Sequence, residues 1–117
     1  MAAAASIKGF SKINLPDDLL QRLVDSIVNA VPTDAIYVFG SYARGEERPG
    51  SDVDIYVITS DDGKRPLEYG ADVRGSLMWT PLSRDVLAAP RPLFEARSKE
   101  FWKVEARVAE EGVRIYG

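Results

Sequence analysis

The sequence predicts an α/β fold, and three segments indicate it. Apolar residues recur at helical spacing between Leu19 and Val31. Residues 35–39 form a short run of β-branched and aromatic residues, which is typical of a buried strand. Residues 52–59 alternate between two faces, as expected for a second strand. One helix followed by two strands therefore opens the domain.

The first helix has recognisable signals at both ends. Asn14 can cap it, Pro16 and Asp17 suit a first turn, and Pro32 stops it. Residues 1–13 before it are expected to form a flexible leader, with three apolar residues as candidate surface anchors. These are Ile7, Phe10 and Ile13. A single domain is thus expected over residues 14–117.

The remaining segments are assigned from turn residues and periodicity. We expect a short helix at 41–45, loops at 46–51 and 60–66, a third strand within 72–80, a short helix from Pro81 and Ser83, one long helix over 93–111 stopped by Gly112, and a closing strand at 113–116.

Composition restricts the chemistry. The 117 residues include no cysteine and no histidine, which excludes disulfides, thiolate metal sites and imidazole chemistry. Oxygen ligands and a hard cation remain. The net charge of −3 gives no general basic field for nucleic acid. No apolar stretch is long enough to span a membrane, so a cytoplasmic location is expected. If so short a chain is an enzyme, the site for its acceptor substrate is expected to be shared with a protein partner or another copy of the chain.

Two carboxylates form a candidate metal site. Asp52 and Asp54 share one strand face, roughly 6.5–7 Å apart by the rise of a strand. Transfer of a nucleotide requires neutralisation of the triphosphate, which two metal ions about 4 Å apart achieve. Magnesium prefers such carboxylate oxygens. We therefore assign Asp52 and Asp54 as metal ligands and catalytic residues.

A glycine–serine turn precedes these carboxylates. Gly40 lets the backbone approach a triphosphate closely, and Ser41 offers a hydroxyl at the start of a helix. Arg44, one turn later, can neutralise phosphate charge. Singly, each feature is more often an ordinary turn, strand edge or surface arginine. Their combination at fixed spacing indicates a nucleotide site.

This motif resembles that of a known family. From Gly40 to Ile58 the chain reads GSYARGEERPGSDVDIYVI, and this pattern is similar to the signature of minimal nucleotidyltransferase (MNT) domains of the DNA polymerase beta-like superfamily. The match includes Ser51, and the segments LMWTP at 77–81 and EEGVRIYG at 110–117 look like the family's third strand and C-terminal end. The resemblance implies a small mixed sheet flanked by helices, Mg²⁺, ATP or another nucleoside triphosphate, and nucleotide binding by Gly40, Ser41, Arg44 and Ser51.

The resemblance also implies a partner. Many such short domains look like the antitoxin of a toxin–antitoxin pair, in which the domain transfers AMP to a tyrosine of an all-helical HEPN toxin.

One feature departs from the family pattern. Members usually carry a third carboxylate about six residues before the Thr-Pro that corresponds to Thr80-Pro81, where this chain has Gly75 or Ser76. Asp72 is the nearest acid and our candidate for the third catalytic residue, and Glu68 is a more remote one. Three functions therefore stay open: an active adenylyltransferase acting on a protein, an inactive binding module that neutralises a partner, and nucleotide transfer to RNA or a small molecule.

Overall fold

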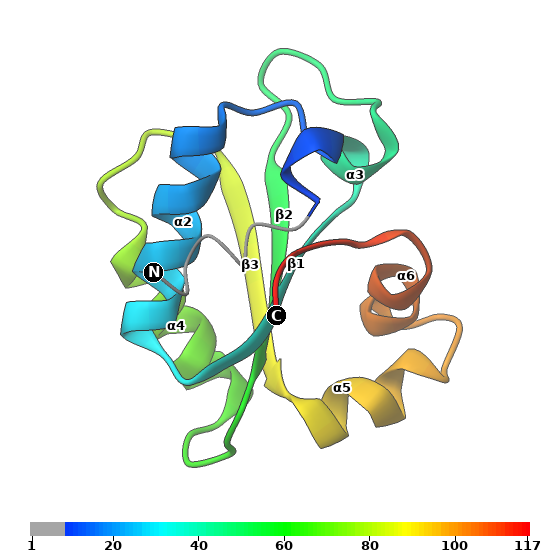
Figure 1. The fold of residues 1–117 in the computed structure, drawn as a ribbon. Helices are drawn as coiled ribbons and strands as arrows, with labels where there is room; N and C mark the ends of the chain where they lie inside the picture. The colour runs from blue at the N-terminus through cyan, green and yellow to red at the C-terminus, as the bar shows by residue number, and fades with distance from the viewer. Residues whose placement is uncertain (1–8) are drawn as a thin grey trace.

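A four-stranded sheet with helices on both faces forms the domain (Figure 1). The computed structural model describes residues 9–117. Its elements, in chain order, are η1 (Phe10–Lys12), α2 (Asp17–Ala30), β1 (Thr33–Phe39), α3 (Ser41–Arg44), β2 (Val53–Thr59), α4 (Pro66–Ser76), β3 (Arg84–Pro90), α5 (Arg91–Ser98), α6 (Val104–Glu111) and β4 (Val113–Tyr116).

The sheet is mixed. Its strand order is β3-β2-β1-β4, with β2 and β3 parallel and the other neighbours antiparallel. The predicted fold class, a small mixed sheet flanked by helices, is confirmed. The parallel pair has its crossover in α4, which covers the sheet beside α2, whereas α5 and α6 lie on the other face (Figure 1).

Alternation within β2 divides the core into two parts. Val53, Ile55 and Val57 pack on the side of α2 and α4, while Tyr56 and Ile58 pack with residues of α5 and α6. This is the alternation that the sequence predicts. Asp54 therefore belongs to the face covered by α5 and α6.

The first helix is confirmed, but its start differs from the prediction. Pro16 takes the N-cap position, and the side-chain amide of Asn14 donates instead to the Glu47 carboxylate at 3.1 Å. Phe10 and Ile13 are only 6% and 4% exposed and pack into the core beside α2, so they are not surface anchors. Ile7 lies outside the described residues.

The strand expected within 72–80 is wrong, because helix α4 extends to Ser76 and a turn follows it. Pro66 opens the helix, and the Glu68 carboxylate accepts a hydrogen bond from the Arg65 backbone N–H at 2.9 Å. Tyr69, Val73 and Leu77 then fall four residues apart on one buried face. The third strand is β3, and no helix starts at Pro81 or Ser83.

The long helix expected over 93–111 is two helices, α5 and α6. Phe94 and Val108 are buried in one cluster, whereas Phe101 lies in the turn between the helices and is 87% exposed. A spacing that fits the helical period thus joined residues of two elements. The strand expected at 113–116 is confirmed as β4. Among the helices of the described residues, none is long and apolar enough to cross a membrane.

Candidate active site

The end of β1 makes a turn that requires glycine. Gly40 has φ 74° and ψ −151°, a conformation that side chains disfavour. A Cβ at this position would also collide with the Asp54 carboxylate, because Phe39 is the register partner of Asp54 on the neighbouring strand. The absence of a side chain at residue 40 therefore lets the turn lie directly against that carboxylate.

The residues after the turn form the short helix α3. Ser41 is its first residue, and its hydroxyl makes no hydrogen bond among the described residues. The hydroxyl of Ser51 instead accepts a hydrogen bond from the Arg48 backbone N–H at 2.8 Å, which closes the loop before β2. Ser41 is thus free to meet a ligand, while Ser51 shapes the loop.

Two carboxylates meet across the parallel strands. Asp54 of β2 is the register partner of Asp85 of β3, so both side chains project from the same face of the sheet. Asp52 immediately precedes β2, and its carboxylate accepts a hydrogen bond from the Ser83 hydroxyl just before β3. The starts of β2 and β3 therefore bring three acidic residues to one end of the sheet.

The electrostatics of Asp54 reflect this crowding. Burial raises the pKa of Asp54 above its ordinary value, and the charges of Asp85 and then Asp52 raise it further. Arg107 of α6 and Arg44 act in the opposite direction on the pKa of Asp54. Mutual repulsion of carboxylates at a partly buried position is the condition that a divalent cation would relieve.

Asp72 does not join this group. It lies on α4, where its carboxylate accepts a hydrogen bond from the Lys64 ammonium at 2.7 Å. Glu68 is engaged at the start of the same helix. The strand on which Asp72 was expected is absent, and Asp85 of β3 is the acidic residue that lies beside Asp54.

Glu111 contributes an unexpected contact. Its carboxylate accepts hydrogen bonds from the Gly40 backbone N–H at 2.7 Å and from Arg44 at 3.0 Å. Arg44 also pairs with Glu46 at 2.9 Å. The Gly40 N–H and the Arg44 guanidinium, both expected to bind phosphate, thus donate to the same carboxylate oxygen of Glu111. They are therefore placed to bind an anion together.

Three functional candidates escaped the sequence reasoning: Asp85, Arg107 and Glu111. Residues 84–89 alternate Asp85, Leu87 and Ala89 on one face with Val86 and Ala88 on the other, a strand signal that could have identified Asp85. Arg107 looked like part of a solvated helix face. Nothing in the sequence links Glu111 to residue 40.

The comparisons with known proteins agree with this geometry. The family model described as nucleotidyltransferase domain matches residues 20–115. The chain belongs to this family. The matched range contains Gly40, Asp52, Asp54 and Asp85, so the nucleotidyltransferase domain spans the whole candidate site. No curated protein sequence matches the chain.

Solved structures show the same fold. A crystal structure of a toxin–antitoxin with AMP-PNP aligns with a TM-score of 0.54 and 21% identity over 84% of this chain and 73% of that chain. A mutant of the toxin–antitoxin MntA-HpeT aligns with a TM-score of 0.52 and 18% identity over 84% and 72%. At these identities the likeness concerns the nucleotidyltransferase fold.

The acidic side chains of the site are of the type that binds a divalent metal ion, but their arrangement in the described residues is not that of a metal site. Among the described residues, no set of three or more acidic side chains is already arranged as a metal site. Asp54 and Asp85 project together, whereas Asp52 is held by Ser83. Carboxylates without histidine or cysteine match the oxygen preference of magnesium.

Proposed function

We propose that this nucleotidyltransferase domain transfers AMP from ATP, with Mg²⁺, to a hydroxyl of a protein partner. The direct pairing of Asp54 with Asp85, beside Asp52 and the Gly40 turn, carries the proposal. It supplies a third carboxylate, whose absence from positions 75 and 76 was the reason to consider an inactive module.

Asp52, Asp54 and Asp85 would hold the metal. When bound, Mg²⁺ neutralises the triphosphate and stabilises charge on the attacking and leaving oxygens. Gly40 and Ser41 would seat the phosphates close to the backbone, and Arg44 would neutralise part of their charge. To bind phosphate with both Gly40 and Arg44, the domain must first release the Glu111 carboxylate from them.

In the proposed reaction, the acceptor hydroxyl oxygen forms a bond to the α-phosphorus. The bond from that phosphorus to the α,β-bridging oxygen breaks, and pyrophosphate leaves. Asp85 takes the hydroxyl proton, a role that its exposed position next to Asp54 permits. Arg107, whose charge acts on Asp54, would offset negative charge at the centre.

The proposed partner is a protein, and we infer that the domain is the antitoxin of a toxin–antitoxin pair with a HEPN-type toxin. Two observations support this. The fold is shared with structures described as toxin–antitoxin complexes, one of them with AMP-PNP. The described residues also provide one small domain with little room for a separate acceptor lobe.

The test is transfer of label from α-labelled ATP to the product of the neighbouring gene, with Mg²⁺. Wild type and Asp72→Asn should label the partner, whereas Asp54→Asn and Asp85→Asn should not. Asp72→Asn is the matched control, since it removes an acid of the same type from helix α4. Label lost in Asp72→Asn and retained in Asp85→Asn would overturn the assignment of Asp85. Inhibition of the partner without label, equal in wild type and Asp54→Asn, would establish the binding-module function instead. Label entering RNA or a small acceptor with no protein partner present would favour transfer to that acceptor instead.

A further inference from the structure

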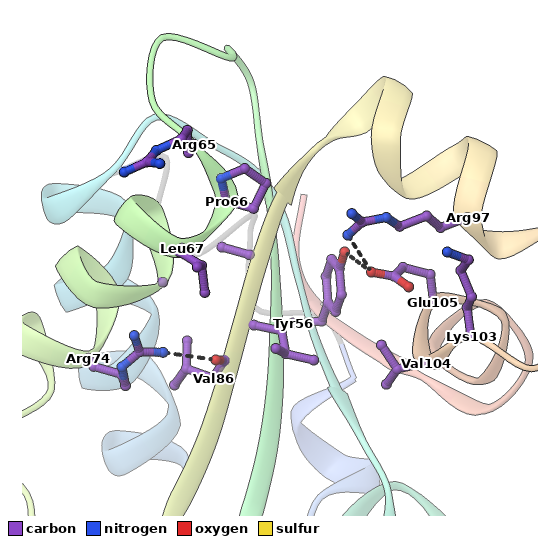
Figure 2. A pocket seen from close by; sticks show the side chains of 13 residues that line it. Tyr56, Arg65, Pro66, Leu67, Arg74, Val86, Arg97, Lys103, Val104 and Glu105 are labelled. Carbon is purple, nitrogen blue, oxygen red and sulfur yellow. Dashed lines mark hydrogen bonds and ion pairs between the residues drawn. The ribbon is translucent and has the colours of Figure 1, made fainter.

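A groove follows the open edge of β3, beyond the start of the strand where the carboxylates lie. It has a volume of about 640 Å³, and β3 forms its floor (Figure 2). Leu67 and Arg74 of α4 line it together with Arg65, which precedes that helix. Arg97 and Lys103 line it from the side of α5 and α6 (Figure 2). We call this feature the edge groove.

The backbone of β3 is open to a further strand. In the described residues β3 pairs only with β2, so one of its edges has no strand partner. The Val86 carbonyl points to that edge, because it accepts a hydrogen bond from the Arg74 guanidinium at 3.3 Å on α4 (Figure 2). Alternation then directs the backbone groups of Ala88 to the same edge. An extended polypeptide could pair with both residues.

The side chains around this edge are apolar and cationic. Leu67 is 80% exposed and Leu87 is 43% exposed, which is unusual for leucine beside an open strand. The lining includes four cationic residues, Arg65, Arg74, Arg97 and Lys103, although the whole chain carries a net charge of −3. Three of these cations lie near carboxylates: Arg65 pairs with Glu68 at 3.5 Å, Arg97 with Glu105 at 3.5 Å and Lys103 with Glu100 at 3.8 Å. The rim of the edge groove thus gathers cationic side chains whose charge is compensated in part.

The only carboxylate in the lining does not compensate for these cations at the surface. Glu105 is 5% exposed, accepts a hydrogen bond from the Tyr56 hydroxyl at 2.8 Å and pairs with Arg97 at 3.5 Å. Arg74 has no carboxylate partner among the described residues. A ligand bearing carboxylates would thus complement the rim of the edge groove.

We propose that the edge groove binds an extended acidic segment of a protein partner, which adds to β3 as a fifth strand. Its backbone would pair with Val86 and Ala88, its apolar side chains would cover Leu67 and Leu87, and its carboxylates would meet the cationic rim. A second copy of the chain fits less well, because joining two β3 edges would bring the two cationic rims together. Nucleic acid would leave the exposed leucines and the strand edge unmatched.

The groove lies next to the candidate active site. Leu87 is two residues beyond Asp85 and projects from the same face of the sheet. A partner segment in the edge groove would therefore extend toward the carboxylates. The inference that this segment carries the acceptor hydroxyl rests on the proposed function. The docking itself does not require nucleotide.

The test uses a fluorescein-labelled peptide of alternating glutamate and valine as the probe, and measures fluorescence anisotropy without nucleotide. Wild type should bind it, and a lysine–valine peptide should not bind. We expect Leu67→Glu and Arg74→Glu to weaken binding by about tenfold each. Met78→Glu and Arg114→Glu are matched controls, since they change similarly exposed residues outside the groove and should alter binding less than about twofold.

Strand addition itself is measured by amide hydrogen exchange. The probe should slow exchange at Val86 and Ala88 and leave the amides of β4 unchanged. The proposal is overturned if wild type fails to bind the probe, if the control variants lose as much affinity as the groove variants, or if β3 gains no protection. Self-association through β3 in sedimentation, or displacement of the probe by an RNA oligonucleotide, would also overturn it by assigning another occupant.

Failure of docking can be told apart from failure of the proposed function. Asp54→Asn should bind the probe as wild type does. Binding of the probe without binding of Mn²⁺–ATP would contradict the transfer reaction and support the edge groove. Binding of Mn²⁺–ATP without binding of the probe would support the nucleotide site and contradict the edge groove.

Discussion

The two faces of the sheet differ in what their residues contribute. The face toward α2 and α4 is packed with apolar side chains such as Leu23, Ile27 and Val57, all fully buried. The face toward α5 and α6 has a smaller apolar cluster and carries Asp54, Asp85 and the buried Glu105. Repulsion and desolvation at Asp54 oppose folding there. The α2/α4 face thus holds the larger apolar core, whereas the other face carries charges that lower stability and form the proposed site.

The largest expected effect comes from removing the charge of Asp54. Asp54→Asn should reduce the proposed AMP transfer by about 100-fold or more, because the variant loses a proposed metal ligand. The same change should raise Tm at neutral pH by removing a desolvated and repelled charge. Circular dichroism melting and the labelling assay measure the two effects. A variant that lost both stability and activity would place Asp54 among the stabilising residues.

The converse change lies on the other face. Leu23→Ala in α2 should lower the free energy of unfolding by about 2–5 kcal/mol, since it leaves a cavity at a side chain that is 1% exposed. Labelling per folded molecule should stay near the wild-type rate at low temperature. Urea unfolding gives the first quantity, and a labelling assay normalised to folded fraction gives the second. A loss of specific activity matching that of Asp54→Asn would break the division between the faces.

The third prediction concerns pH. Because the pKa of Asp54 is raised in the folded state, this group favours folding below the ordinary aspartate pKa, and that contribution is lost as pH rises through its folded pKa. The Tm advantage of Asp54→Asn should therefore grow with pH over this window. Mn²⁺ affinity of wild type should increase over the same window, as Asp54 loses its proton.

Asp85→Asn provides the control for this titration. Removing the Asp85 charge should move the midpoint of the pH dependence lower, because Asp85 raises the pKa of Asp54. The pH dependence of Tm, measured without metal, gives the midpoint in both proteins. An unchanged midpoint would show that Asp85 does not act on Asp54.

The smallest effect is expected at Glu111. Glu111→Gln keeps an oxygen for the Gly40 N–H but releases Arg44 from a charged partner, so ATP affinity should rise by roughly two- to tenfold. Glu110→Gln is the matched control, as the neighbouring residue is exposed. Weaker ATP binding in Glu111→Gln would mean that the carboxylate positions Arg44 for phosphate rather than competing with it.

The parts of the fold that the sequence predicted depend on local patterns. The α2 periodicity, the alternation of β2 and the Gly40 turn each require only neighbouring residues, and all three are confirmed. The resemblance located Asp52 and Asp54 through a short motif of fixed spacing.

The errors arose where the pattern was ambiguous or the partner distant. Residues 72–80 were assigned to a strand from a weak local pattern, while the burial of Tyr69, Val73 and Leu77 fits a helix over most of the segment. The third carboxylate was therefore predicted at Asp72, whereas Asp85 is the acidic residue paired with Asp54 in the sheet. Glu111 was beyond prediction for a different reason, since its contact with Gly40 spans 71 positions and exists only in the folded chain.

This long-range contact has a consequence for folding kinetics. Like the Glu111–Gly40 hydrogen bond, the pairing of Asp54 with Asp85 joins segments that are distant in the sequence, and closing such contacts is slow compared with forming helices. After dilution from urea, recovery of Mn²⁺–ATP binding should trail the return of the far-ultraviolet helical signal. The rate at which Mn²⁺–ATP binding recovers would then report the last step of folding.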